Sequence, residues 1–392
     1  MQPEVFGSIT TGRACRRGII QSFLFTIAAA VFLFVNMTDI LRSSATQHHR
    51  MSDPRLKAFH ETFLTKAVIE KFGYSAAEWK SMIRLGVPHQ IKSFCDAIAE
   101  ANHSLVPDCS SSIMPDLWIG KKRESKVRLV VGLPTVLRPV KQYVKSTLKR
   151  LLRDLKPMDR NSTVILVFLA DTDQTATQQL LSLFFQNFQS EIESGLIELL
   201  VPNRRFYKIM ESEPCYGSIK DQAFRLDKTP CQDDYLRWRN KQNFDYSYLM
   251  AYGSQLGEFY LQMEDDMMCG SELFPKVFGA ITSFSIRPFV FAEVTGRGFR
   301  GKMFRSNDTF HLSQYLLRRF DAMPCDWLYP IFAENLPNPC EADPERYPQA
   351  QHDCGSHSRK LRLVDEKGRD LCHHRGRFSS LKGKVVPIHL AT

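Results

Sequence analysis

The stretch that decides the fold is a run of five alternating segments between residues 127 and 202. It reads VRLVVGLP (127–134), VKQYVKSTLKRLLRDL (140–155), STVILVFLADTD (162–173), ATQQLLSLFFQNFQSEIESG (176–195) and LIELLVP (196–202). The first, third and fifth segments are short apolar runs that predict buried strands, and the other two have the apolar spacing of helices. Strands that alternate with helices predict a parallel sheet with right-handed crossovers. The predicted fold class is therefore α/β with a Rossmann-type sheet.

Polar side chains follow the ends of these strands. Because ligands of open parallel sheets bind beyond the carboxyl ends of the strands, these side chains are expected near a ligand site; they are Thr135, Arg138, Asp171 and Asp173. Further along the chain, residues 236–253 predict a helix. The segment FYLQMEDDM (259–267) then predicts a short buried strand that runs into acidic residues.

Three consecutive carboxylates, Glu264, Asp265 and Asp266, lie at the end of that apolar strand. Like charges at a buried strand end destabilise one another unless a cation compensates them. A hard divalent cation that bridges a diphosphate would compensate them and would also neutralise the diphosphate as a leaving group. The alternative is a solvated acidic turn. The position on the edge of a nucleotide-binding type of sheet favours the cation site.

The N-terminal part of the chain predicts a membrane anchor. Residues 19–35 (IIQSFLFTIAAAVFLFV) contain no charged side chain, and three arginines precede them. At about 1.5 Å per residue this run nearly crosses a hydrocarbon core of about 30 Å. The arginines predict a cytosolic tail, residues 1–18, and a lumenal remainder. A cleaved signal peptide is the alternative, but no convincing small-residue cleavage site follows Val35.

Charge and cysteine usage agree with a lumenal protein. Most of the formal net charge of +10 falls in residues 1–50 and 355–392, so the body is nearly neutral and nucleic acid is not expected as a partner. Nine of the ten cysteines follow the predicted anchor, and their odd number leaves at least one free or bonded to another chain. Their pairing is left open. Asparagines in N-glycosylation sequons are Asn102, Asn161 and Asn307.

The chain divides into a helical lumenal stem, residues 36–125, and a catalytic-type domain, residues 126–392. Within the domain, matching stretches carry a resemblance to a known family; they are GLPTVLR (132–138), FLADTD (168–173), RWRNKQNFDYSYLM (237–250), YLQMEDDM (260–267), GFRGKMF (298–304) and CDWL (325–328). From about Val127 to Trp327, and more loosely to Lys384, the chain resembles the N-acetylglucosaminyltransferase IV family (alpha-1,3-mannosyl-glycoprotein 4-beta-N-acetylglucosaminyltransferases, glycosyltransferase family 54).

This resemblance implies a GT-A fold, a single-pass type II protein of the Golgi membrane and an enzyme that inverts the anomeric centre. The implied donor is UDP-N-acetylglucosamine, the implied metal is Mn²⁺, and the implied acceptor is a core mannose of N-glycans, which receives a beta-1,4 branch. By position, Asp266 is the candidate for direct metal contact. Glu264 and Asp265 would then shape the surroundings of the nucleotide and the metal.

Further roles follow by position from the same resemblance. The uridine would be met by Thr135, Arg138 and Asp171. One helix would present Arg239, Lys241, Gln242 and Asn243 to the donor, since residues 239, 242 and 243 share a helix face; a solvated helix surface is the alternative. Inversion needs a carboxylate that deprotonates the attacking hydroxyl, and Asp326 is the candidate base. The alternative for Asp326 is an N-cap of the helix that follows.

The sequence departs from the family pattern in two places. Family members continue into a lectin-like C-terminal domain, whereas this chain ends at Thr392. The family also has a terminal segment of the form QHxGxHSSLxGK, where this chain has HHRGRFSSLKGK (373–384). Phe378 therefore replaces an imidazole, while His374 remains as a candidate phosphate or metal contact. Arg297 and Arg300 also stand where the family is less charged.

Three interpretations remain open at this point. The first is an active N-acetylglucosaminyltransferase that acts on N-glycans, which the intact carboxylates favour. The second is a catalytically weak paralogue that binds and regulates other Golgi N-acetylglucosaminyltransferases, which the altered terminal segment favours. The third is an active transferase with another acceptor.

Overall fold

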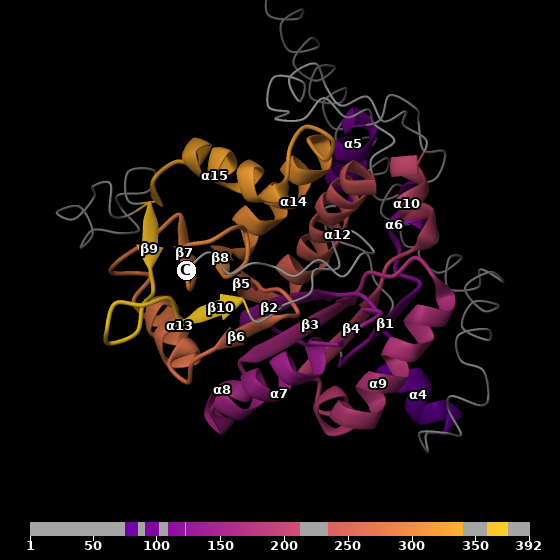
Figure 1. Ribbon diagram of the computed structural model, residues 1–392, viewed down its shortest axis with the longest axis horizontal. Coiled ribbons are helices and arrows are strands. Elements are labelled where there is room, and N and C mark those ends of the chain that lie inside the picture. The colour runs from indigo at the N-terminus through magenta and orange to yellow at the C-terminus, as the bar shows by residue number, and fades with distance from the viewer. Residues whose placement is uncertain are drawn as a thin grey trace, which may run out of the picture. The chain divides into compact units, whose positions relative to one another are not determined.

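Among the described residues, an eight-stranded sheet organises the domain, and Figure 1 shows its arrangement. The computed structural model describes residues 75–84, 91–101, 109–121, 123–211, 234–339 and 359–374. Within them the strand order is β1-β4-β3-β2-β5-β8-β7-β9. The strands are β1 (Leu117–Ile119), β2 (Val127–Thr135), β3 (Thr163–Leu169), β4 (Ile197–Val201), β5 (Gly257–Gln262), β7 (Phe291–Glu293), β8 (Lys302–Arg305) and β9 (Lys360–Arg362).

The central strands β4, β3, β2 and β5 are parallel to one another, which confirms the predicted α/β class. Every residue of β3 (TVILVFL) is buried, as expected of a strand covered on both faces. The strands β1 and β8 add antiparallel partners at either side of this parallel centre. The sheet is therefore parallel where the first, third and fifth sequence segments predicted it and mixed toward its edges.

Helices cover both faces of the sheet (Figure 1). Those labelled below the sheet in this view include α7 (Val144–Asp154), α8 (Pro157–Arg160) and α9 (Gln174–Glu193). Those on the opposite side include α12 (Asp234–Leu256), which packs on β2, β3 and β5, and α14 (Ser306–Arg318), which packs on α12. The remaining described helices are α4 (Ala76–Met82), α5 (Ile91–Ala101), α6 (Cys109–Ile113), α10 (Arg204–Glu211), α13 (Leu273–Thr282) and α15 (Cys325–Asn335).

The predicted strand over residues 259–267 is interrupted. β5 ends at Gln262, the chain turns at Asp265 and Asp266, and a separate strand β6 (Met267–Cys269) begins directly afterwards. β6 pairs antiparallel with β10 (Cys372–His374) in a small two-stranded sheet. The interruption has a physical reason, because the two aspartates leave the sheet to meet cationic partners that are described below.

Part of the predicted stem belongs to the folded domain. β1 lies within residues 36–125 and pairs with β4, where buried Glu198 accepts hydrogen bonds from Trp118 Nε1 at 2.9 Å and from Arg84 at 2.8 and 3.0 Å. The helix α5 packs against α14, and a Cys95–Cys109 disulfide joins α5 to α6. These contacts place residues before 126 within the folded domain. The sequence did not indicate β1, because a three-residue strand is too short for its pattern to be recognised.

The described residues contain two disulfides, Cys95–Cys109 and Cys269–Cys372, and one buried unpaired cysteine, Cys325. No helix among the described residues is long and apolar enough to cross a membrane. The expected anchor, residues 19–35, lies outside the described part of the chain.

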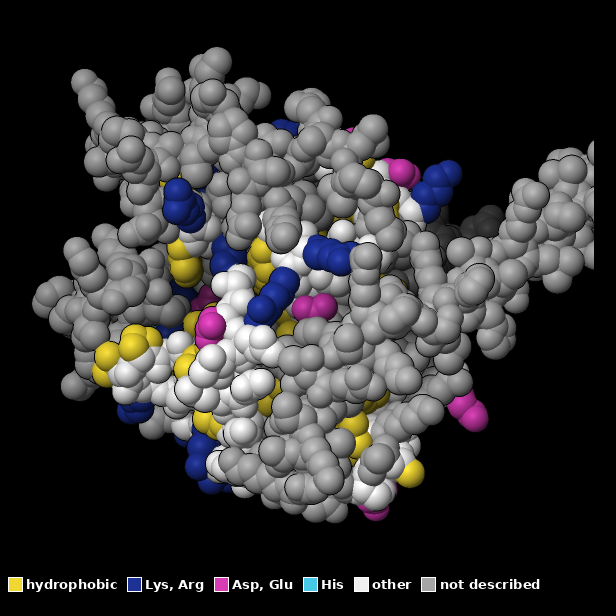
Figure 2. Space-filling view, turned by 90° about the vertical axis from the view of Figure 1, so that its right-hand side faces the viewer, with side chains coloured by type: hydrophobic (Ala, Val, Ile, Leu, Met, Phe, Trp, Pro, Cys, Tyr) yellow, Lys and Arg dark blue, Asp and Glu magenta, His cyan; other side chains and the backbone are white. Residues whose placement is uncertain are grey.

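One face of the domain is shown in Figure 2, seen from the right-hand side of Figure 1. Lys and Arg side chains lie beside Asp and Glu side chains, with hydrophobic side chains between them. Charges of both signs are thus interspersed among the described residues in view, and these residues form no continuous patch of one sign on this face.

Candidate active site

The acidic turn between β5 and β6 is held by the ends of neighbouring elements. Thr135, the last residue of β2, donates a hydrogen bond from Oγ1 to Asp265 Oδ2 at 2.7 Å. Arg138, just beyond β2, forms an ion pair with Asp265 and lies 3.4 Å from Asp266 Oδ2. From α7, Thr147 donates to the backbone oxygen of Asp265 at 2.7 Å. The expected convergence at the carboxyl ends of β2 and β5 is therefore present.

Asp266 has one paired and one unpaired carboxylate oxygen. Its Oδ2 lies 3.0 Å from Nε2 of His374, a residue of β10, and accepts a hydrogen bond from it. Its Oδ1 is buried and has no hydrogen-bond partner. Burying a carboxylate oxygen without a partner costs free energy unless a ligand supplies a hydrogen bond or a positive charge. This atom therefore points to a cationic or hydrogen-donating ligand at the turn.

The neighbouring aspartates have pKa values shifted in opposite directions. Burial raises the pKa of Asp265 above its ordinary value, and the Arg138 guanidinium opposes that rise without cancelling it. Burial also acts to raise the pKa of Asp266, but the His374 hydrogen bond and the His374 and Arg138 charges outweigh it, so the net pKa is lowered. Asp266 is therefore the carboxylate that the site keeps ionised.

Glu264 faces a different set of groups. Its Oε2 lies 3.3 Å from Arg300 Nη1, and its Oε1 accepts from the Tyr246 hydroxyl at 3.4 Å. Burial and the charge of Asp266 raise the pKa of Glu264 to about 7, although Arg300 acts against them. Glu264 therefore carries only part of a negative charge near neutral pH, which lessens the repulsion within the triplet.

Asp326 is the second residue of α15, and its side chain does not cap that helix. Instead, Asp326 Oδ1 accepts a hydrogen bond from the Phe299 backbone at 2.7 Å. Gly298 has φ +60°, and a Cβ at this position would lie 3.2 Å from Asp326 Oδ1, so only glycine fits without strain. In the described part of the chain, Oδ2 accepts no hydrogen bond, and the side chain is exposed. The carboxylate is thus oriented and open to a hydroxyl.

The α12 side chains expected to meet the donor mostly contact protein groups. Asn243 is fully buried and donates to the backbone oxygens of Phe320 and Met323 at 2.7 and 2.9 Å. Arg239, one turn earlier, donates to the Asp321 oxygen. Arg239 and Asn243 thus lie on one face of α12 and hold the segment that leads into α15 and Asp326. Their expected contact with the donor stays a prediction.

The two other α12 candidates differ from each other. Lys241 Nζ contacts the Ala170 oxygen at 2.6 Å and Asp245 at 2.8 Å, which ties α12 to the end of β3. Gln242 is partly exposed and contacts the Tyr246 hydroxyl at 3.4 Å. Lys241 is partly exposed as well, so a donor contact by Lys241 or Gln242 stays a prediction.

Several remaining predicted residues are placed as follows. Asp171 Oδ2 accepts from the Leu137 backbone at 2.7 Å, and burial raises the pKa of Asp171. Asp173 caps α9 by accepting from Ala176 N at 2.7 Å. Asn161 and Asn307 are exposed, whereas Asn102 lies outside the described residues, as do Phe378 and the rest of residues 375–392.

Sequence reasoning missed residues that contact the acidic triplet from other elements. Thr147 sits on the buried face of α7, where it was read as part of an amphipathic helix. Tyr246 lies inside the motif RWRNKQNFDYSYLM (237–250), which by itself assigns it no role. The sequence marks Arg300 only as a charge at a position where the family is less charged. No local pattern reports such contacts, because each joins positions 18 to 118 residues apart.

A divalent cation fits the unpaired oxygen of Asp266. Among the described residues, no group of three or more His, Cys, Asp and Glu side chains is arranged to hold a metal. Asp266 and His374 would thus supply few ligands, and substrate phosphate oxygens and water would complete the shell, as is common for hard cations at nucleotide sites. The donor set is compatible with a metal that binds together with a nucleotide.

Comparison with known proteins agrees with the geometry. Residues 90–389 match the family model described as the MGAT4 conserved region. The chain is 33% identical over 283 residues to alpha-1,3-mannosyl-glycoprotein 4-beta-N-acetylglucosaminyltransferase B of Danio rerio, covering 71% of this chain and 47% of the relative.

The chain belongs to the N-acetylglucosaminyltransferase IV family. Another member of the family, alpha-1,3-mannosyl-glycoprotein 4-beta-N-acetylglucosaminyltransferase A of Xenopus tropicalis, is 32% identical over 279 residues, which are 71% of this chain and 48% of the relative. The chain thus spans about half the length of these relatives. The predicted family is confirmed, and its members are N-acetylglucosaminyltransferases that imply UDP-N-acetylglucosamine as donor.

Proposed function

We propose that this N-acetylglucosaminyltransferase IV family member is an inverting, metal-dependent transferase of the GT-A type. It would move N-acetylglucosamine from UDP-N-acetylglucosamine to a core mannose of N-glycans and form a beta-1,4 branch. The observation that carries the proposal is the buried, unpaired Oδ1 of Asp266 beside His374, at the carboxyl edge of a parallel sheet. The names of the relatives supply the donor and the acceptor class.

The chain's own residues have distinct tasks in this proposal. Arg138 and Thr135 hold Asp265, which fixes the turn, and Asp266 with His374 faces the diphosphate. Mn²⁺, when bound there, would neutralise the diphosphate as it leaves. Asp326, oriented by the Phe299 amide through Oδ1, accepts the proton of the attacking hydroxyl on its other oxygen, Oδ2. The fixed orientation places the base before the acceptor arrives, which lowers the entropic part of the barrier.

We also propose that the protein resides in the Golgi membrane as a type II protein, with residues 19–35 as anchor and the domain in the lumen. The two disulfides support an oxidising compartment. Glycosylation at the exposed Asn161 and Asn307 would be compatible with that location.

One observation supports a second candidate, a catalytically weak member that binds and regulates other Golgi N-acetylglucosaminyltransferases. Each carboxylate of the triplet already has a cationic neighbour, namely Arg300 for Glu264 and Arg138 for both Asp265 and Asp266. A triplet compensated in this way depends less on a metal for its stability. Such a site would retain its shape without turnover.

A transfer assay separates the two candidates. The full chain, purified in detergent from animal-cell membranes, is incubated with UDP-N-acetylglucosamine, Mn²⁺ and a biantennary N-glycan. Asp266→Asn and Asp326→Asn are assayed in parallel, with Asp96→Asn, at an exposed position on α5, as the matched aspartate control away from the triplet. We expect product from the unmodified chain and from the control variant, but losses of about 100-fold or more for the other two.

The variants also assign the roles. Asp326→Asn should keep UDP binding in the presence of Mn²⁺, because the base does not touch the nucleotide, whereas Asp266→Asn should lose it. Absence of product from folded chain would reject the transferase proposal. Retained UDP binding without product would then favour the second candidate.

A further inference from the structure

Two residue pairs of the β6–β10 sheet separate the Cys269–Cys372 disulfide from the acidic turn. Cys269 ends β6, Cys372 begins β10, and the two residues face each other with their Cα atoms 4.0 Å apart. The same register sets His374 opposite Met267, the residue that follows Asp266. His374 Nε2 thereby reaches Asp266 Oδ2 at 3.0 Å. The cross-link and the histidine contact are thus two ends of one short strand pair.

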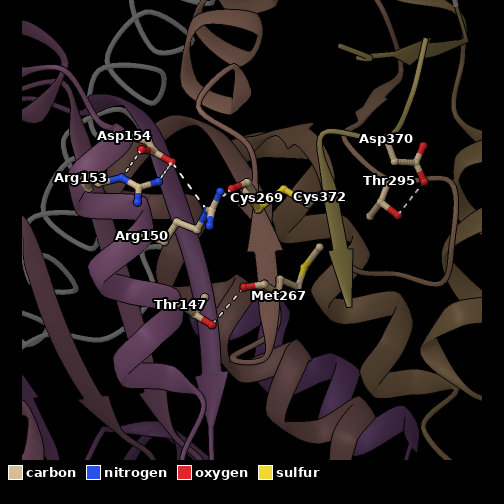
Figure 3. The surroundings of a disulfide bond; sticks show 9 residues. All are labelled: Thr147, Arg150, Arg153, Asp154, Met267, Cys269, Thr295, Asp370 and Cys372. Carbon is tan, nitrogen blue, oxygen red and sulfur yellow. Dashed lines mark hydrogen bonds and ion pairs between the residues drawn. A yellow bond between two sulfur atoms is a disulfide. The ribbon is translucent and has the colours of Figure 1, made fainter. Parts of the chain in front are cut away.

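β6 is the fixed half of this pair, because α7 holds it from the other side (Figure 3). Thr147 Oγ1 lies 3.1 Å from the Met267 oxygen and 2.7 Å from the Asp265 oxygen. One helical turn further along, Arg150 Nε donates to the Cys269 oxygen at 2.5 Å. α7 therefore anchors both the acidic turn and the cysteine that carries the cross-link.

β10 has weaker attachments of its own. Asp370 accepts a hydrogen bond from Thr295 Oγ1 at 3.2 Å and Leu371 N donates to the Val294 oxygen at 2.9 Å, both just before the strand (Figure 3). Within β10, the Cys372 amide donates a longer hydrogen bond, 3.3 Å, to the same Val294 oxygen. A three-residue strand in a two-stranded sheet is marginal by itself. The disulfide closes a loop of 103 residues, so without it the chain must bring these positions together at an entropic cost.

We infer that the Cys269–Cys372 disulfide is a positioning element that holds the His374 imidazole against Asp266. The cysteines themselves touch no substrate in this scheme. They act through β10, whose pairing with β6 carries the imidazole to the carboxylate. The consequence for nucleotide binding rests on the proposed function, whereas the positioning itself does not.

The positioning is tested by chemical labelling of histidines without any ligand. The full chain is treated with diethyl pyrocarbonate, which acylates accessible imidazole nitrogens, and the peptide with residues 373 and 374 is resolved by mass spectrometry. His373 is exposed and serves as an internal reference, whereas the His374 side chain is only 19% exposed. In Cys269→Ser/Cys372→Ser we expect His374 labelling to rise several-fold relative to His373.

Two further variants keep this test informative. Cys95→Ser/Cys109→Ser removes the other described disulfide, on α5 and α6, and should leave the labelling ratio unchanged. Cys269→Ala/Cys372→Val places apolar side chains at two buried positions, so it guards against misfolding from buried hydroxyls. It should raise the ratio as the serine variant does. A ratio that stays at the unmodified value in both cross-link variants overturns the inference.

A binding measurement tests the consequence. Calorimetry of UDP with Mn²⁺ should show about tenfold weaker binding for His374→Ala, because loss of a group that orients a metal ligand typically costs that much. Removal of the cross-link should weaken binding to a similar extent and add little in the His374→Ala background, since both changes remove one contact. Additive losses would overturn the inference. If the unmodified chain binds no UDP, the proposed function fails, and the labelling ratio alone decides the positioning.

Discussion

The ion pair of Arg138 with the acidic turn allows a prediction that can be worked out in detail. The Arg138 side chain is 11% exposed, and its partners Asp265 and Asp266 are 4% and 6% exposed. Arg138→Met keeps the length of the side chain but removes the counter-charge. Removing one partner of a buried pair typically costs about 3–5 kcal/mol. We expect the lower end, about 3 kcal/mol, because Thr135 still donates to Asp265.

The assay is urea unfolding of the full chain in EDTA, followed by tryptophan fluorescence. With a urea dependence of about 3 kcal/mol per M, the midpoint should fall by about 1 M. The pH dependence of the loss in unfolding free energy follows from Asp265. Burial raises the pKa of Asp265 in the folded chain, although Arg138 opposes the rise. Without Arg138 this pKa rises further, so the stability that depends on a neutral Asp265 is present at low pH and lost as pH rises. The deficit should therefore shrink from pH 7.5 toward pH 4.

Two controls accompany this prediction. Arg138→Met/Asp265→Asn removes both charges and should recover much of the loss, because no uncompensated carboxylate remains at that position. Arg153→Met removes an exposed cation of α7 that pairs with Asp154, and it should leave the midpoint nearly unchanged. An Arg138→Met midpoint equal to that of the unmodified chain would refute the argument that this charge holds the turn.

Other positions give shorter predictions. Burial raises the pKa of Asp116 to about 6, so its stability contribution is greatest below 3.8 and lost as pH rises through about 6. Asp116→Asn should then be more stable than the unmodified chain at pH 7.5, by up to about 3 kcal/mol, with the difference vanishing near pH 4; no difference at pH 7.5 would contradict this. Trp327 is 55% exposed beside Asp326 and could stack on an acceptor sugar. Trp327→Ala should raise the KM for the glycan acceptor several-fold and leave the KM for the donor unchanged, and a donor effect alone would contradict it.

The central sheet was predictable because its information is local. The apolar runs of β2, β3 and β4 and the helices between them carry their own periodicity, and parallel pairing follows from the alternation. The edges were not predictable in this way. β1 is three residues long, and its place is decided by Glu198, a charged side chain inside a strand that needs Trp118 and Arg84 as partners.

For the candidate site, the sequence alone determined the strand ends that meet and the acidic triplet that lies there. These two inferences rest on residue type and on neighbours along the chain. The candidate base, Asp326, came instead from the resemblance of CDWL (325–328) to the family. Only the tertiary structure decided that Asn243 faces the segment before α15, that Glu264 meets Arg300, and that His374 reaches Asp266 through a disulfide-linked strand pair. Such contacts join residues far apart in sequence, and their formation depends on the packing of the whole domain.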